Sequence, residues 1–527
     1  MPFTLKRSLL YRIWIMKKIA IIMLLIVSAC VPKTAERSMF LKQVDPVAMR
    51  MVLAEMPKGA ELHTHLSGIP YAENYLKWAA DDGACIHELS GSIVAGPCVN
   101  GTVAAKEAYR QPDVWGRAVD ALSVREGMRD NRMWGHDRFF ATFGRFGAAK
   151  RDKGRLLAHA VKQAERDNVQ YLEVMLSIYG PQWVSPWAAE VGWNGKADEC
   201  FVRLKQAGLF KDMDSARKEL GRAERRQRQL VGNGPGSAVK VRYINQIFRG
   251  AEPAYVFAQM AWSFELVRRD PHVVGLNMVG PEDGPIAARD YALHMDMLDF
   301  FHSKYPDVPI ALHAGELTPT LTTPQALANH IKLAVTKGHA RRIGHGVGLA
   351  YETAPLNTLA LMRQKDVALE VLLGSNDVIL NVSGRDHPLN FYLKEEVPVV
   401  ISSDDMGIAR STLTDEYERA VADQGLNYLA VKRVVRNSLQ YSFLEGQSLW
   451  DNATSFKMVP ACYRDDQPDL DCEAFLLSSE KAREQWKLEE KLSRFEDSEV
   501  FKRFKEDYSK QISTIIEKGV DAGLGFL

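Results

Sequence analysis

The chain has 527 residues, of which 46% are hydrophobic and 25% are charged, and its formal net charge at pH 7 is +1. This is the composition of an ordinary globular protein. The small net charge excludes a whole-molecule electrostatic attraction to nucleic acid or to an anionic membrane, so binding specificity must be local.

The chain begins with a pattern typical of an export signal. Lys17 and Lys18 precede the apolar run of residues 19–28, which is too short to span a bilayer. We therefore predict that residues 1–30 are a signal peptide and that Met16 is the true start of the protein. The alternatives for the apolar run are an uncleaved membrane anchor and a buried core segment.

The apolar run ends in VSAC, which resembles the lipobox of bacterial lipoproteins. This resemblance implies cleavage before Cys30 and lipid modification of that cysteine. The expected location is the cell envelope, with Val31 favouring the outer membrane on its periplasmic side, and secretion is the alternative. The membrane contact that we expect is made only through this lipid anchor.

The remaining cysteines are compatible with export to an oxidising compartment. Cys85 and Cys98 form one closely spaced pair, and Cys462 and Cys472 form another. Each pair could form a disulfide that closes a short loop and contributes about 2–3 kcal/mol. Their connectivity does not follow from the sequence.

Eight β-rich runs alternate with longer helical patterns along the chain. The predicted strands are residues 60–66, 169–176, 238–247, 273–279, 309–315, 341–346, 367–374 and 398–405. Most are continuous apolar runs, as expected for strands buried on both faces of a parallel sheet. Residues 288–305 and 323–338 are examples of the predicted helices between them. Eight βα units predict an α/β fold of the TIM-barrel type.

The lengths between the predicted strands indicate additions to the barrel. We predict a subdomain inserted after the first strand and extra helices elsewhere. The expected segments are a lead-in at 31–58, a barrel at 59–450, insertions at about 70–165 and 181–237, and a helical extension at 451–527.

Chemically active side chains follow four of the eight predicted strands. His63 and His65 end the first strand, and they point to the same side because side chains alternate along a strand. The other strand ends carry His313 and Glu316, His345, and Asp404 and Asp405. In a TIM barrel, catalytic groups gather at the carboxyl ends of the strands.

Three of these histidines and one aspartate form a set of ligands for zinc. His63, His65, His313 and Asp404 supply three nitrogens and one oxygen and leave room for a water molecule. For His63 and His65 alone, exposed or hydrogen-bonded histidines are an equally good interpretation. The matching residues at three further strand ends favour the metal site.

The same stretches resemble the adenosine deaminase family of metal-dependent amidohydrolases. The resemblance is greatest to its secreted branch, the adenosine deaminase-related growth factors. The matching segments between about residue 56 and residue 445 are MPKGAELHTH, FFATFG, YLEV, VVGLNMVGPED, LHAGE, RIGHG, VISSDD and RNSLQYS. The cysteine-bearing insertion is similar to that branch's extra subdomain, though shorter.

The resemblance implies roles for particular residues. It implies one zinc ion per chain, bound by His63, His65, His313 and Asp404. It implies that Glu316 is the proton donor and that His345 orients and deprotonates the attacking water. It implies substrate contacts by Asp405 to purine N7, by the Gly280 backbone to N3, and by His65 and Ser67. The lysine that bridges two metals in dinuclear relatives is missing after the fourth strand, which favours a single metal.

The expected function is deamination of adenosine and 2′-deoxyadenosine outside the cytoplasm. The expected partner is a small purine nucleoside rather than nucleic acid, and a homodimer remains open. Intracellular members of the family carry an aspartate that contacts the ribose 5′-hydroxyl where this chain has Ser67. One alternative is therefore the same chemistry on another 6-aminopurine nucleoside. The other alternative is a non-catalytic surface module that binds nucleosides or acts like a growth factor, although a binder has no need of a proton donor.

Overall fold

The structure is a computed structural model that describes residues 45–125, 135–178, 181–463 and 468–506. The predicted signal peptide, with Met16 and Cys30, and the first half of the lead-in lie outside the described residues. Within the described residues, no helix has the length and apolarity needed to cross a bilayer.

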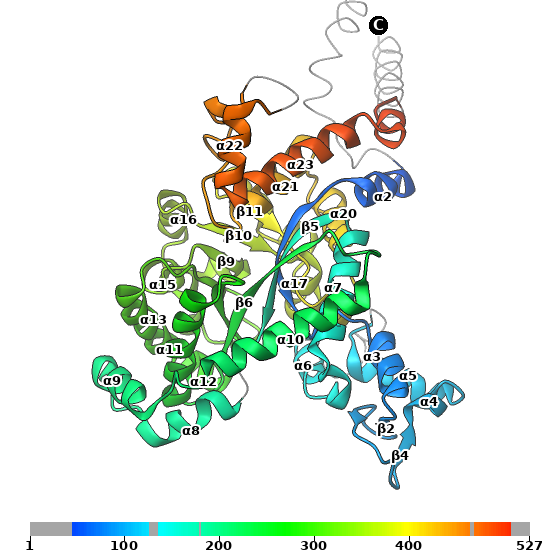
Figure 1. Cartoon of the computed structure of the whole chain (residues 1–527), viewed down its shortest axis with the longest axis vertical. Helices are drawn as coiled ribbons and strands as arrows, with labels where there is room; N and C mark the ends of the chain where they lie inside the picture. The colour runs from blue at the N-terminus through cyan, green and yellow to red at the C-terminus, as the bar shows by residue number, and fades with distance from the viewer. Residues whose placement is uncertain (1–44, 126–134, 179–180, 464–467, 507–527) are drawn as a thin grey trace, which may run out of the picture.

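Eight parallel strands form the centre of the molecule (Figure 1). They are β1 (Gly59–His65), β5 (Val169–Leu176), β6 (Lys240–Phe248), β7 (Val273–Val279), β8 (Ala311–Ala314), β9 (Arg342–His345), β10 (Ala368–Val371) and β11 (Val399–Ile401). Hydrogen bonds join the strands in the orders β1-β5-β6-β7 and β8-β9-β10-β11. Parallel bridges between Leu276 and Ile310 and between Thr64 and Asp404 join the two halves into a closed ring. The predicted TIM barrel is confirmed.

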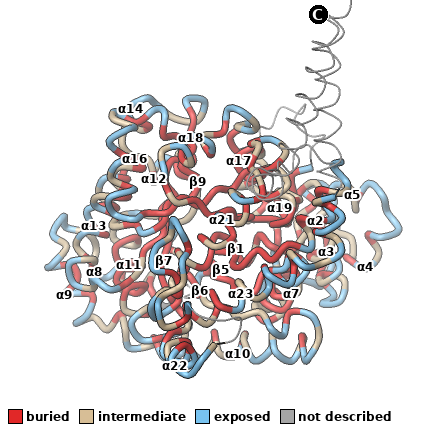
Figure 2. Tube along the Cα trace, turned by 90° about the horizontal axis from the view of Figure 1, so that it is seen from above, coloured by how far each residue is buried: buried red, intermediate tan, exposed pale blue. Residues whose placement is uncertain are grey.

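The strands are buried because helices surround them on the outside, as Figure 2 shows. The helices between β5 and β8 are α8 (Pro181–Val191), α9 (Ala197–Ala207), α10 (Met213–Val231), α11 (Pro253–Arg269), α12 (Pro285–Arg289) and α13 (Tyr291–Lys304). Those after β8 are α14 (Pro324–Leu327), α15 (His330–Thr336), α16 (Pro355–Gln364), α17 (Leu373–Leu380), α18 (Leu389–Lys394), α19 (Met406–Ala409), α20 (Leu413–Ala422) and α21 (Tyr428–Gln440).

Two helices predicted as continuous are each broken in the structure. The pattern at 288–305 divides into α12 and α13 at Asp290, whose φ of −102° and ψ of 11° are not helical. The pattern at 323–338 divides into α14 and α15 at Asn329, whose φ is −153°. Asp and Asn side chains compete for backbone hydrogen bonds and favour helix ends over helix interiors.

A small subdomain follows β1 and extends from the barrel at the lower right of Figure 1. It contains α3 (Ala72–Asp81), β2 (Cys85–His87), β3 (Ile93–Val94), β4 (Thr102–Ala104), α4 (Ala105–Ala108) and α5 (Pro112–Leu122). The three short strands are antiparallel, and a disulfide joins Cys85 to Cys98. Helix α6 (Gly135–Thr142) then returns the chain to the barrel. Helix α7 (Lys153–Arg166) packs against β5, so this part of the predicted insertion belongs to the barrel's own helices.

Both ends of the described chain pack against the barrel. Helix α2 (Pro46–Glu55) lies against α20, and α23 (Glu480–Glu496) lies against α21. Glu480 of α23 pairs with Lys240 at 2.9 Å and with Arg242 at 2.6 Å, both at the amino end of β6. A second disulfide joins Cys462 to Cys472 in α22 (Leu470–Ser478). The predicted C-terminal extension is mostly helical from Leu470 onward, whereas residues 451–459 form turns and an isolated bridge, and its residues from 507 lie outside the description.

Candidate metal centre and active site

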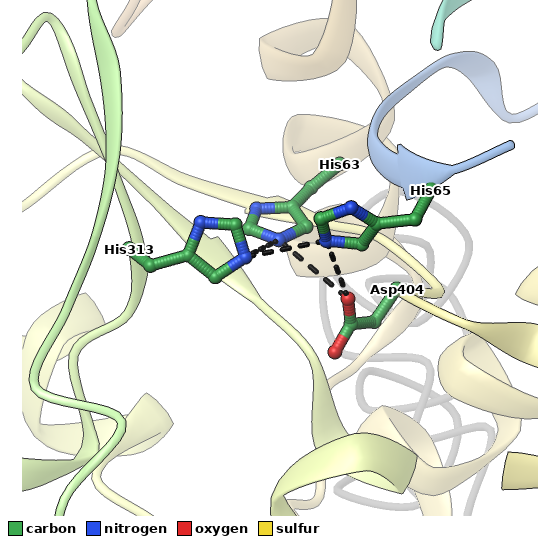
Figure 3. A group of neighbouring side chains, drawn as sticks. All are labelled: His63, His65, His313 and Asp404. Carbon is green, nitrogen blue, oxygen red and sulfur yellow. Dashed lines mark hydrogen bonds and ion pairs between the residues drawn. The ribbon is translucent and has the colours of Figure 1, made fainter. Parts of the chain in front are cut away.

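Four of the predicted ligands converge at the carboxyl end of the barrel (Figure 3). The Nε2 atom of His313 lies 3.1 Å from Nε2 of His63 and 3.3 Å from Nε2 of His65. Asp404 Oδ1 lies 3.3 Å from Nε2 of His65 and 3.7 Å from Nε2 of His63. Ligand atoms held about 2.0–2.1 Å from one tetrahedral metal ion are separated by roughly 3.3 Å. The spacing therefore fits a single metal ion.

The chemistry of these donors also fits a cation. All four side chains are buried, and imidazole nitrogens at such short separations repel one another unless a proton or a metal ion lies between them. Asp404 Oδ2 accepts a hydrogen bond from Ser375 Oγ at 2.6 Å, so that Oδ1 faces the histidines.

Outer hydrogen bonds orient the three imidazole rings. His63 Nδ1 lies 2.5 Å from Glu370 Oε2, and His313 Nδ1 lies 2.8 Å from Asn277 Oδ1. These acceptors keep the proton on Nδ1 and leave the Nε2 lone pair directed at the centre. His65 Nδ1 lies 2.5 Å from the Gln246 side-chain nitrogen, and rotating that amide would present its oxygen in the same way.

The backbone around the site is held by contacts between β1 and the end of β11. Asp404 N–H donates to the His63 carbonyl at 3.0 Å, and Thr64 Oγ1 donates to the Asp404 carbonyl at 2.8 Å. Asp404 and His345 have φ values of 56° and 72°, in the left-handed region that non-glycine residues rarely adopt. Such strain of order 1–3 kcal/mol persists where the surroundings impose it, typically at functional sites.

Glu316 is placed as a neutral acid beside the metal ligands. It is 5% exposed, and its Oε1 lies 3.5 Å from His345 Nε2. Burial, together with the nearby charge of Asp404, raises the pKa of Glu316 well above its ordinary value. A carboxyl held in its protonated form can donate a proton at neutral pH.

The hydrogen-bond network assigns the tautomer of His345. The Leu389 N–H donates to His387 Nδ1 at 3.1 Å, so His387 carries its proton on Nε2 and donates to Asn376 Oδ1 at 3.1 Å. The Asn376 amide therefore turns its NH₂ group toward His345 Nδ1, 2.9 Å away. Burial lowers the pKa of His345 to about 3, so the ring is neutral with its proton on Nε2. In this state, His345 is a hydrogen-bond donor toward the site.

A cavity of about 310 Å³ lies over the metal ligands. Its volume is within the range of small-molecule sites. The predicted substrate contacts His65, Ser67, Gly280 and Asp405 all line it, together with Glu316. Its remaining walls include four phenylalanines, which are Phe139, Phe140, Phe143 and Phe248. A larger cavity of about 860 Å³ contains none of the predicted site residues.

Asp405 lies in the cavity wall against a glycine. A Cβ atom at Gly68 would be 1.5 Å from Asp405 Oδ1, so only glycine at position 68 leaves room for this carboxyl. Burial, followed by the adjacent charge of Asp404, raises the pKa of Asp405 well above its ordinary value. Asp405 can therefore act as a hydrogen-bond donor.

Several residues of the site were not predicted from the sequence. They are Gly68, Gln246, Asn277, Glu282, Arg342, Glu370, Asn376 and His387. Arg342 lies between two buried carboxylates. Its Nε lies 2.5 Å from Glu370 Oε1, and its Nη2 lies 2.7 Å from Glu173 Oε2. A charged residue within an apolar strand could have indicated these buried pairs, because a buried charge needs a partner. Arg342 in RIGHG, Glu173 in YLEV and Glu370 in ALEV are such residues.

Comparison with known proteins identifies related sequences. The family described as "Adenosine deaminase" matches residues 137–449, more than half of the chain. His63 and His65 precede this match, and the structure brings them to the matched ligands His313 and Asp404. Similar proteins include adenosine deaminase 2-A of Danio rerio, 34% identical over 34% of this chain and 35% of that protein. An adenine deaminase of Agrobacterium fabrum is 32% identical over 34% of this chain and 50% of that protein.

The aligned segments thus span between about a third and a half of the length of these relatives. Among solved structures, the N6-methyl-AMP deaminase of Arabidopsis thaliana is 17% identical with a TM-score of 0.48, covering 75% of this chain and 94% of that one. By the match to residues 137–449, the chain belongs to the adenosine deaminase family.

Proposed function

We propose that the protein is a zinc-dependent deaminase that converts adenosine and 2′-deoxyadenosine to the corresponding inosines and ammonia. The observation that carries this proposal is the carboxyl of Glu316, which is buried beside a four-ligand site for one metal ion, where burial raises its pKa well above the ordinary value. Three nitrogens and one oxygen in tetrahedral spacing favour zinc among the common metals.

The proposed reaction divides the work among three side chains. A bound zinc ion supplies Lewis-acid activation of water at neutral pH. Glu316 donates a proton to purine N1, which makes C6 electrophilic. His345 Nε2–H orients the attacking oxygen, and the protonated Asp405 donates a hydrogen bond to N7. Of the two protons of the water, one restores Glu316 and the other leaves with the 6-amino group, which becomes ammonia when the C6–N bond breaks. A non-catalytic nucleoside-binding module would not need a proton donor at Glu316.

A second candidate substrate is another 6-aminopurine, such as adenine or a modified nucleoside. Ser67 offers only a short neutral group in the cavity, and the similar proteins include an adenine deaminase. Among the described residues, no lysine or arginine lines the cavity, so a phosphate group would have no cationic partner there. We therefore expect AMP to be a poor substrate.

The test is ammonia release from adenosine, 2′-deoxyadenosine, adenine and AMP by the purified, zinc-loaded protein. We expect the two nucleosides to give the highest kcat/KM. Highest turnover of adenine would instead establish the second candidate. The absence of turnover with every purine, in a preparation that contains one zinc per chain, would refute the deaminase proposal.

The Glu316→Gln variant is the control for this assay. It retains the four metal ligands but has no proton to donate to N1, so kcat is expected to fall at least about 10²-fold with a much smaller change in KM. Zinc content is measured on the same preparation. A zinc-replete variant within a few-fold of the parent's kcat would exclude Glu316 as the proton donor.

We also propose that the enzyme acts outside the cytoplasm as a lipoprotein anchored through Cys30. The support is the apolar run that ends in VSAC. The parent protein is expected to incorporate labelled fatty acid and to sediment with membranes, and Cys30→Ser is expected to do neither. A Cys30→Ser variant that is labelled like the parent would refute the anchor.

A further inference from the structure

Glu282 is a buried carboxylate that contacts the backbone of the proton donor. It follows β7 in the segment VGPEDG, and its side chain is inaccessible to solvent. Its Oε2 accepts a hydrogen bond from the Glu316 N–H at 2.8 Å, and its Oε1 accepts one from the Gly315 N–H at 3.1 Å. Two successive backbone amides after β8 therefore point at one carboxylate.

These hydrogen bonds hold a turn that requires glycine. Gly315 has a φ of +77°, and this conformation turns the chain so that the amides of Gly315 and Glu316 face the same way. On the opposite side, the Gly315 carbonyl accepts a hydrogen bond from the Gly348 N–H at 2.9 Å. The turn is thus held from both sides, and the Glu316 side chain leaves it toward the cavity.

His330 fixes the orientation of Glu282 in turn. Its Nδ1 lies 2.5 Å from Glu282 Oε1, at the first residue of α15. The imidazole ring stacks on Tyr291 with ring centres 3.7 Å apart, and the Tyr291 hydroxyl donates to the His330 carbonyl at 2.8 Å. These contacts hold the His330 ring beside Glu282 Oε1.

We propose that Glu282 is a positioning residue for the proton donor Glu316, and that His330 is the residue that orients Glu282. This inference rests on the proposed deaminase function. Glu282 is not among the residues that line the substrate cavity, and its direct contact with the proton donor is the hydrogen bond from the Glu316 backbone. The pKa values of the two buried carboxyls are also shifted in opposite directions. Burial raises the pKa of Glu282, but the hydrogen bond and charge of His330, the charge of Arg249 and the Gly315 N–H together lower it below the ordinary value.

The first test is Glu282→Gln, which keeps the size of the side chain but turns an NH₂ group toward one of the two amides. Because supporting residues of active sites typically contribute 10- to 100-fold, we expect kcat to fall by about that factor. KM and zinc content should stay within about threefold of the parent's. The matched control is Asp167→Asn, since Asp167 is a buried carboxylate that accepts the Thr414 N–H far from the cavity.

A double-mutant cycle with Glu316→Gln separates positioning from a general structural role. If Glu282 acts through Glu316, Glu282→Gln should cause no further loss of kcat in the Glu316→Gln background. An equal loss in both backgrounds would overturn the proposal.

His330→Phe retains the stacking on Tyr291 but removes the hydrogen-bond donor to Glu282, so a loss of kcat is expected in this variant. Recovery of kcat is expected in His330→Gln, whose amide can donate.

Hydrogen exchange tests the same proposal without any need for turnover. In Glu282→Gln, the peptide covering residues 311–320 should exchange faster than in the parent and in Asp167→Asn. Unchanged exchange in this peptide would overturn the positioning role. If the parent deaminates no purine while this exchange still increases, the proposed function fails and the contact between Glu282 and Glu316 stands.

Discussion

His345 and Asn376 illustrate how one side-chain orientation determines the chemistry of another. Because His387 Nε2–H donates a hydrogen bond to the oxygen of the Asn376 amide, the NH₂ group of that amide faces His345 Nδ1. The proton of the neutral His345 ring is then on Nε2, directed at the site where the attacking oxygen must lie. The family resemblance implied that this histidine also deprotonates the water, and the tautomer favours its orienting role.

Replacing Asn376 with Asp tests this assignment. A carboxylate accepts a hydrogen bond from Nδ1–H, so the imidazole proton should move from Nε2 to Nδ1. If His345 acts as a donor to the attacking oxygen, kcat should fall on the order of 10²-fold, as for the loss of one oxyanion donor. His387→Gln is the control, because its amide can still donate to Asn376. A kcat equal to or above the parent's in Asn376→Asp would instead identify Nε2 as a proton acceptor.

The two disulfides lie in elements at opposite ends of the molecule as it is seen in Figure 1. Cys85 and Cys98 close a loop with a sequence separation of 13 in the small antiparallel sheet, and Cys98 is exposed. Cys462 and Cys472 have a separation of 10 and are 4% and 1% exposed. Loops of this length contribute about 3 kcal/mol in the chain-entropy model. Because the small sheet has little core of its own, it should depend on its disulfide more than the barrel does.

We predict that Cys85→Ser with Cys98→Ser makes the subdomain, and not the barrel, sensitive to proteolysis. Limited proteolysis followed by mass spectrometry should locate new cleavage within residues 84–104, while zinc content and kcat remain near the parent's values. Mild reductant should give the same result in the parent and leave the buried pair Cys462–Cys472 intact. Cleavage first within β5 to β11 would show that this disulfide supports the barrel instead.

At the scale of the whole molecule, the metal ligands connect distant parts of the barrel ring. His63 and His65 come from β1, His313 comes from β8, and Asp404 follows β11. In the closed order of strands, β8 lies opposite β1. A bound ion would therefore tie opposite sides of the barrel together, and its binding free energy would add to the stability of the native state.

Removal of the metal should therefore lower the melting temperature. A ligand present at 100 times its Kd stabilises the native state by about 2.7 kcal/mol, and tighter binding contributes more. Differential scanning calorimetry with and without a chelator should show a lower Tm without metal, and zinc should restore it. His313→Ala should melt at the temperature of the metal-free parent, and neither the chelator nor zinc should change its Tm. Identical Tm values for the parent with and without zinc, when elemental analysis confirms the two states, would contradict the linkage.

The sequence by itself determined the barrel and the residue types at its carboxyl edge. Apolar runs alternate with helical patterns along the chain, and each pattern depends only on residues close together in the sequence. All eight strands were therefore predicted within a few residues of their observed bounds. Parallel strands place their carboxyl ends at the same edge, which is why His63, His313, His345 and Asp404 could be grouped without a structure.

The tertiary structure alone decided how these residues are held and which protonation state each one has. Glu370 is 307 residues from the His63 ring that it orients, and Glu282 is 34 residues from Glu316, whose N–H donates a hydrogen bond to it. Neither spacing forms a periodic pattern, because such contacts arise only when the ring of strands closes. The raised pKa of Glu316 has the same origin, since burial and the charge of Asp404 act on it only after folding removes water from the site.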